Sequence, residues 1–177
     1  MRLRVEPGLP LWTTSENLGL LINAEPNLRI SSNGIIGLRF GVGLNIQKFE
    51  NNFSSQYSFD QQNDNAIISF IPTFDYYFNH NYIRPYAGLG ISYCVISSVI
   101  LESPSREVPE GSVNNQLEFL FRSGFEVGKT RIGLEYNFIP RADIKVPNGQ
   151  IIGTVNYSYF GVTIGFNIGK GKNTKRI

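Results

Sequence analysis

A strict alternation of large apolar residues with small or polar ones over residues 35–46 is the feature that most constrains the fold of this chain. One face of the segment carries only Ile36, Leu38, Phe40, Val42, Leu44 and Ile46. The other face begins with Ile35 and continues with Gly37, Arg39, Gly41, Gly43 and Asn45. A period of two predicts a β-strand. A uniformly apolar face opposite a face of glycines fits the wall of a small closed barrel with lipid outside and a narrow interior.

The same division recurs along the chain, which predicts a fold made of such strands. We expect strands over 18–30, 67–78, 83–96, 117–127, 131–138 and 157–168, and a shorter first strand within 2–7. Leu21 is an exception, because it falls on the polar face of its segment. Together with the segment at 35–46, these make eight strands. The prediction is an all-β, closed antiparallel up-and-down transmembrane barrel.

The charged residues decide which face of these strands is the interior. An Arg or Lys that faces hydrocarbon near the bilayer midplane costs roughly 2–4 kcal/mol. In the segments over 18–168, every charge lies opposite the apolar register, so we expect five acids and five arginines to form a lumen charge network. They are Glu25, Asp75, Glu118, Glu126 and Glu135 with Arg29, Arg39, Arg84, Arg122 and Arg131. The solvated face of a soluble barrel would also be charged, but we expect it to carry lysines and few glycines.

The connections between the segments alternate in length. Links at 31–34, 79–82 and 128–130 are short and contain Gly, Asn or Ser, as tight hairpins do. Links at 47–65, 97–115 and 141–154 are long and mostly polar, and continuing the alternation backwards predicts another outer loop at 8–17. Outer-membrane barrels alternate short periplasmic turns with longer external loops, so this pattern supports eight strands with both ends on one side.

Length and composition leave room for one barrel and little else. We expect a barrel domain over 1–169 and a basic, flexible tail over 170–177. No apolar run reaches the 18 residues of a spanning helix. The net charge of +2, without a reading motif, indicates no nucleic-acid partner. An exported barrel needs a signal, and no apolar segment follows Met1, so we expect the sequence to be a mature or truncated region.

Two strands carry a family resemblance. The segments Ile-Arg-Pro-Tyr-Ala-Gly-Leu-Gly-Ile-Ser-Tyr over 83–93 and Tyr-Phe-Gly-Val-Thr-Ile-Gly-Phe-Asn-Ile over 159–168 resemble the small outer-membrane β-barrel superfamily of Gram-negative bacteria, with its porin-like, OmpA-like and OmpW-like members. The resemblance covers nearly the whole chain and implies the fold and an outer-membrane location. Many members end on an aromatic residue that the assembly machinery recognises, whereas here Phe166 is followed by a tail.

Chemistry-bearing motifs are scarce in the sequence. The single histidine, His80, lies in the predicted turn at 79–82, which is poorly placed for a Ser-His hydrolase. No His and Cys spacing for zinc and no phosphate-binding glycine loop is present. We expect no catalytic residue, no cofactor and no metal site.

These observations predict a non-enzymatic outer-membrane barrel with a lumen filled by side chains, acting as a surface, adhesion, envelope-stabilising or accessory protein. Its external contacts are expected from Phe53, Tyr57 and Phe59 in the second long link. Expected partners are outer-membrane lipid, the barrel-assembly machinery during insertion and another envelope protein. Two alternatives stay open: a narrow pore for small solutes, and a soluble barrel that binds an apolar ligand inside.

Overall fold

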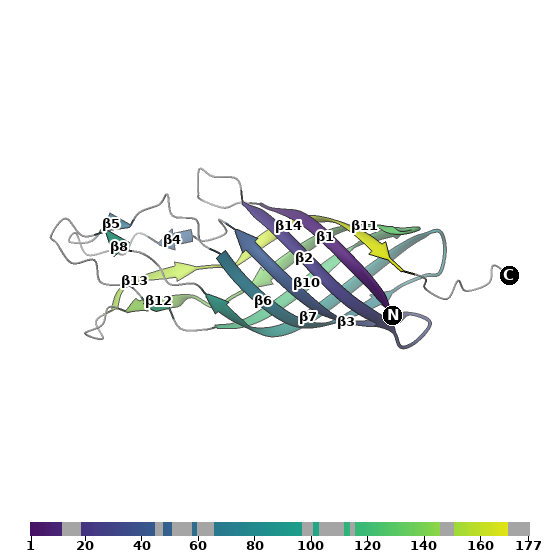
Figure 1. Cartoon of the computed structure of the whole chain (residues 1–177), viewed down its shortest axis with the longest axis horizontal. Helices are drawn as coiled ribbons and strands as arrows, with labels where there is room; N and C mark the ends of the chain where they lie inside the picture. The colour runs from purple at the N-terminus through teal and green to yellow at the C-terminus, as the bar shows by residue number, and fades with distance from the viewer. Residues whose placement is uncertain are drawn as a thin grey trace.

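The computed structural model describes residues 1–11, 19–44, 48–50, 58–59, 66–96, 101–102, 112–113, 116–145 and 151–169. Eight long strands form one closed barrel, in the order β1-β14-β11-β10-β7-β6-β3-β2, and every neighbouring pair is antiparallel (Figure 1). The barrel strands are β1 (Arg2–Leu11), β2 (Leu20–Arg29), β3 (Gly34–Leu44), β6 (Ala66–Tyr77), β7 (Ile83–Ile96), β10 (Gln116–Val127), β11 (Thr130–Phe138) and β14 (Tyr159–Ile168). The predicted eight-stranded barrel is confirmed.

The barrel closes between its first and last strands. Leu3 pairs with Ile168 and Leu11 with Phe160, so the beginning of β1 and the end of β14 lie at the same end of the barrel. The sequence predicted a first strand within 2–7 and a loop from residue 8, and this boundary was wrong. β1 continues to Leu11, because Gly8, Leu9 and Pro10 extend the ladder with β14.

Six short strands lie beyond the barrel, at the end opposite Met1 (Figure 1). β4 (Lys48–Glu50), β13 (Ile151–Asn156), β12 (Ala142–Lys145) and β9 (Ser112–Val113) form one sheet, and β5 (Ser58–Phe59) pairs with β8 (Leu101–Glu102). The link at 141–154, which we predicted as a polar loop, therefore contains β12 and most of β13. Its residues form strands because the two segments pair with each other and extend the hairpin of β11 and β14.

Burial alternates along the barrel strands with the period that the sequence predicts. In β14 the exposed residues include Phe160, Ile164, Phe166 and Ile168, whereas Thr163 and Asn167 between them are buried. The apolar register faces outward and the polar register faces the lumen. A soluble barrel with an apolar interior requires the opposite arrangement, so that alternative is wrong.

The lumen is filled in layers along the barrel axis. Toward the long-link end it holds buried apolar side chains, among them Leu21, Ile67, Ile71 and Leu120. A layer of charged side chains follows, and Ile35, Tyr77 and Tyr86 form an apolar cluster toward the short turns. Eight strands give an interior that side chains can fill, as these layers do.

Candidate functional site: the buried charge network of the lumen

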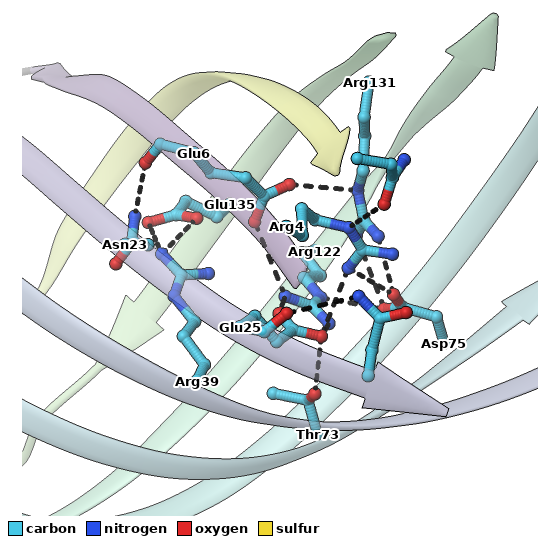
Figure 2. Close-up of polar contacts among 12 residues, drawn as sticks. Arg4, Glu6, Asn23, Glu25, Arg39, Thr73, Asp75, Arg122, Arg131 and Glu135 are labelled. Atoms are coloured by element: carbon cyan, nitrogen blue, oxygen red, sulfur yellow. Dashed lines mark hydrogen bonds and ion pairs between the residues drawn. The ribbon is translucent and has the colours of Figure 1, made fainter. Parts of the chain in front are cut away.

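Three arginines converge on one carboxylate at the centre of the lumen. Asp75 Oδ2 accepts hydrogen bonds from Arg4 Nη1 at 3.0 Å and Arg131 Nη1 at 2.6 Å, and Asp75 Oδ1 accepts one from Arg122 Nε at 2.8 Å. All four side chains are at most 2% exposed. Figure 2 shows these side chains reaching Asp75 from β1, β10 and β11. Each of these three strands contributes one guanidinium, and none of them pairs with β6, which carries Asp75, so the cluster ties β6 to strands that are not its neighbours in the barrel.

Two further acids complete this central cluster. Glu25 accepts hydrogen bonds from Arg122 Nη1 at 2.6 Å and from Arg4 Nη1 at 3.1 Å. Glu6 lies 3.3 Å from Arg131 Nε and 3.8 Å from Arg122 Nη1 (Figure 2). The central cluster thus contains Arg4, Arg122 and Arg131 with Glu6, Glu25 and Asp75, and its formal charge is zero. A buried charge is tolerated when it is paired and hydrogen-bonded in this way.

Two peripheral ion pairs flank the central cluster. Arg39 Nη2 donates to Glu135 at 2.7 and 2.8 Å, and both side chains are buried. Arg84 pairs with Glu126, whose second oxygen accepts a hydrogen bond from the Tyr77 hydroxyl at 2.6 Å. Arg4 Nη2 donates to the same hydroxyl at 3.3 Å, which links this pair to the central cluster.

Glycines on the lumen register make room for these long side chains. A Cβ atom at Gly88 would lie 2.1 Å from Asp75 Oδ1, and one at Gly37 would lie 2.2 Å from Glu25 Oε1. Real Cβ atoms do not come this close, so larger residues at these positions would displace the carboxylates. The glycines that alternate with the apolar residues in the sequence therefore provide the space that the central cluster occupies.

Tyrosine rings hold the arginine heads in place. The Arg131 guanidinium lies 3.5 Å from the centroid of the Tyr86 ring, and the Arg84 guanidinium lies 5.0 Å from that of Tyr77. Such cation–π contacts are strongest where water is excluded. Arginine suits this lumen better than lysine, because its planar head can bond two carboxylates and stack on a ring at once.

The structure places most of the predicted lumen charges together, with one correction. Arg29 lies on the lumen register of β2 but at the last residue of the strand, where its side chain is exposed and donates to the Ser32 carbonyl at 3.0 Å. It does not belong to the ion-paired network. Glu118 is fully buried, but among the described residues it forms no ion pair. The other eight predicted charges all form buried or partly buried ion pairs.

Arg4 and Glu6 were not in the predicted network, although both belong to the central cluster. The signal was in the sequence, since Arg2, Arg4 and Glu6 alternate with Leu3 and Val5 in the first segment. Of the predicted external contacts, Phe53 and Tyr57 lie outside the described residues, and Phe59 lies in β5.

The central cluster and the two peripheral ion pairs fill the lumen, and their acids and arginines neutralise one another. His80 is exposed in the turn between β6 and β7, at the end of the barrel away from the long links. Within the described parts of the chain, no group of three or more His, Cys, Asp or Glu side chains is arranged to hold a metal ion. The same parts contain no helix of the length and hydropathy that crossing a membrane requires.

The outer face of the barrel carries a continuous band of apolar side chains. At mid-strand, Leu89, Phe121 and Leu134 are 55–57% exposed, and aromatic residues such as Tyr76, Phe78 and Phe138 are exposed near strand ends. An apolar surface of this extent marks contact with lipid or protein. A closed barrel is also one of the two folds that satisfy all backbone groups in lipid, and single-chain barrels of this kind span bacterial outer membranes. The chain is a small outer-membrane β-barrel.

Comparisons with known proteins find other small barrels. No protein-family model matches this outer-membrane barrel, and no curated protein matches its sequence. The N-terminal β-barrel domain of Pseudomonas aeruginosa OprF is 11% identical and has a TM-score of 0.48, covering 94% of this chain and 97% of that one. The outer membrane enzyme PagL is 12% identical with a TM-score of 0.45, covering 96% and 100%. Ail, the attachment invasion locus protein of Yersinia pestis, is 10% identical with a TM-score of 0.47, covering 94% and 96%. Because these TM-scores are below 0.5, the assignment rests on the outer face and lumen of this barrel.

Proposed function

We propose that this outer-membrane barrel is a closed, non-conducting and non-enzymatic protein that acts through its external end. The observation that carries the proposal is the lumen, where the central cluster and the two peripheral ion pairs join side chains from β1, β2, β3, β6, β7, β10 and β11. A conducting path would have to separate buried ion pairs, each of which is costly to leave without a partner.

The external end supports a role in surface contact. The short strands β4, β9, β12 and β13 build a sheet beyond the barrel rim at the end where the long links lie (Figure 1). Binding residues are often carried by loops on a rigid scaffold. We propose that this end, including Phe53, Tyr57 and Phe59, contacts another envelope protein or a surface outside the cell. Outer-membrane lipid surrounds the barrel in this proposal, and the barrel-assembly machinery inserts it.

Single-channel recording in planar bilayers tests the closed lumen. The wild-type protein, refolded in detergent and shown to be folded by its gel shift, is expected to give no current steps above the leak of the bare bilayer. A double variant Asp75→Ala with Arg122→Ala removes two large side chains without changing the net charge, and it is expected to open a measurable path. Reproducible ohmic steps from the wild-type protein would instead favour the narrow-pore alternative.

Labelling of intact cells tests the external position of the long links. In a Cys94→Ser background, Tyr57→Cys is expected to react with a membrane-impermeant maleimide. The matched variant His80→Cys, in the short turn between β6 and β7, is expected to react only after the cells are lysed. The reverse pattern would place the short turns outside and refute the proposed surface role.

A further inference from the structure

Glu118 stands apart from the other buried acids of the lumen. Six acids and five arginines line the described lumen: Glu6, Glu25, Asp75, Glu118, Glu126 and Glu135 with Arg4, Arg39, Arg84, Arg122 and Arg131. Each arginine pairs with at least one of the other five acids. Glu118 is 0% exposed, its Oε2 has no hydrogen-bond partner, and it accepts a hydrogen bond from Asn137 Nδ2. It is the acid in excess of the arginines.

A cavity of about 10 Å³ lies beside this carboxylate, between β2, β3, β6, β10, β11 and β14. Its volume is close to the smallest that holds one water molecule. The polar side chains that line it belong to Asn23, Ser69, Glu118, Asn137 and Tyr159. The space beside two of them depends on Gly41, where a Cβ atom would lie 2.7 Å from Ser69 Oγ and 2.9 Å from Asn23 Oδ1.

Hydrogen bonds to neighbouring groups orient the two amides of this cavity. Asn23 Nδ2 donates to the Glu6 carbonyl at 3.1 Å, and Asn137 Nδ2 donates to Glu118 and to the Tyr159 hydroxyl. Their NH₂ groups are therefore engaged, and Asn137 Oδ1 is buried without a partner. Together with Glu118 Oε2, the cavity offers one carboxylate oxygen and neutral oxygens, which is the ligand chemistry of a hard cation.

We propose that this cavity binds one monovalent cation of the size of sodium, with Glu118 as its charge partner and Asn23, Ser69 and Asn137 as neutral oxygen ligands. A buried carboxylate without a partner is costly, and one monovalent cation neutralises it. A divalent ion would leave a net positive charge in the lumen. The site adds a ligand to the proposed function, and its test does not depend on whether the lumen conducts.

A sodium titration at constant ionic strength tests this site. The full chain, refolded in detergent, is unfolded with urea while sodium chloride replaces choline chloride, and the folded fraction is read from the gel shift. Above the dissociation constant, the folded-to-unfolded ratio of the wild-type protein is expected to rise about tenfold for each tenfold rise in sodium. Glu118→Gln is expected to abolish this rise, and Ser69→Ala to shift it to higher sodium.

Ser92→Ala is the matched control for Ser69→Ala. Ser92 pairs across the ladder with Glu118 and donates to the Phe70 carbonyl, but it does not line the cavity, so its sodium response is expected to equal that of the wild type. An equal response in wild type and Glu118→Gln would overturn the proposal. So would a wild-type stability that depends on pH and not on sodium, which would mean a protonated carboxyl, or stabilisation by calcium at far lower concentration than by sodium.

Discussion

Replacing Asp75 by asparagine removes the acid on which three buried arginines converge. The side chain keeps its size, but the central cluster changes from a formal charge of zero to +1, and the new NH₂ group cannot accept hydrogen bonds from the guanidinium groups. The donors involved are Arg4, Arg122 and Arg131, at 3.0, 2.8 and 2.6 Å. Removing one partner of a buried ion pair costs about 3–5 kcal/mol. We therefore expect the unfolding equilibrium constant to rise by about two to four powers of ten.

Urea unfolding in detergent micelles measures this loss, with the folded fraction read from the mobility of unboiled samples. The control is Asp143→Asn, at an exposed aspartate of β12, for which we expect a change within about 0.5 kcal/mol. In the double variant Asp75→Asn with Arg131→Met, the central cluster returns to equal numbers of acids and arginines. Its free-energy loss is expected to fall short of the sum of the single losses by about 0.5–3 kcal/mol. A loss below about 1 kcal/mol for Asp75→Asn, or strictly additive losses, would refute the reasoning.

Two further predictions concern the outer face and the lumen glycines. Leu134→Arg is expected to destabilise the barrel by about 2–4 kcal/mol and Ile168→Arg by about 0–1 kcal/mol, because the penalty for a charge on the lipid face falls toward the interface. The two side chains are equally exposed, at 57% and 56%, so equal urea midpoints would mean that water surrounds both. Gly88→Ala is expected to lower the refolding yield and stability, because its Cβ would lie 2.1 Å from Asp75 Oδ1. The adjacent lipid-facing Ala87→Val is the control, and equal behaviour of the two variants would contradict the packing argument.

The strands and their faces could be predicted because a barrel imposes the same period on every strand. The segment at 83–96 coincides with β7, and the predicted segment at 131–138 lies within β11 (Thr130–Phe138). Each residue in a barrel strand faces either lipid or the lumen, and these two environments demand opposite chemistry. Arg39 and its glycine neighbours were therefore informative before any contact was known.

The partners within the lumen could not be predicted from the same pattern. Arg122 bonds Glu25, which is 97 residues away, because strand tilt and closure bring β10 opposite β2. Arg29 lies on the lumen register, but at the last residue of β2 and therefore at the end of the barrel. The period of two shows which face of a strand a residue occupies, but not how far along the barrel axis it lies. The hairpin of β12 and β13 was missed because its strands have only four and six residues, and because their pairing with each other, with β9 and with β4 cannot be seen in the alternation of one segment.

The most direct test of the account is whether the purified chain needs detergent to remain monodisperse, combined with its mobility in gels before and after boiling. The apolar outer band predicts that the protein aggregates when detergent is removed and that the unboiled, folded barrel migrates faster than the boiled chain. A compact, monodisperse protein in buffer without detergent would contradict the account, because the apolar register could not then face water.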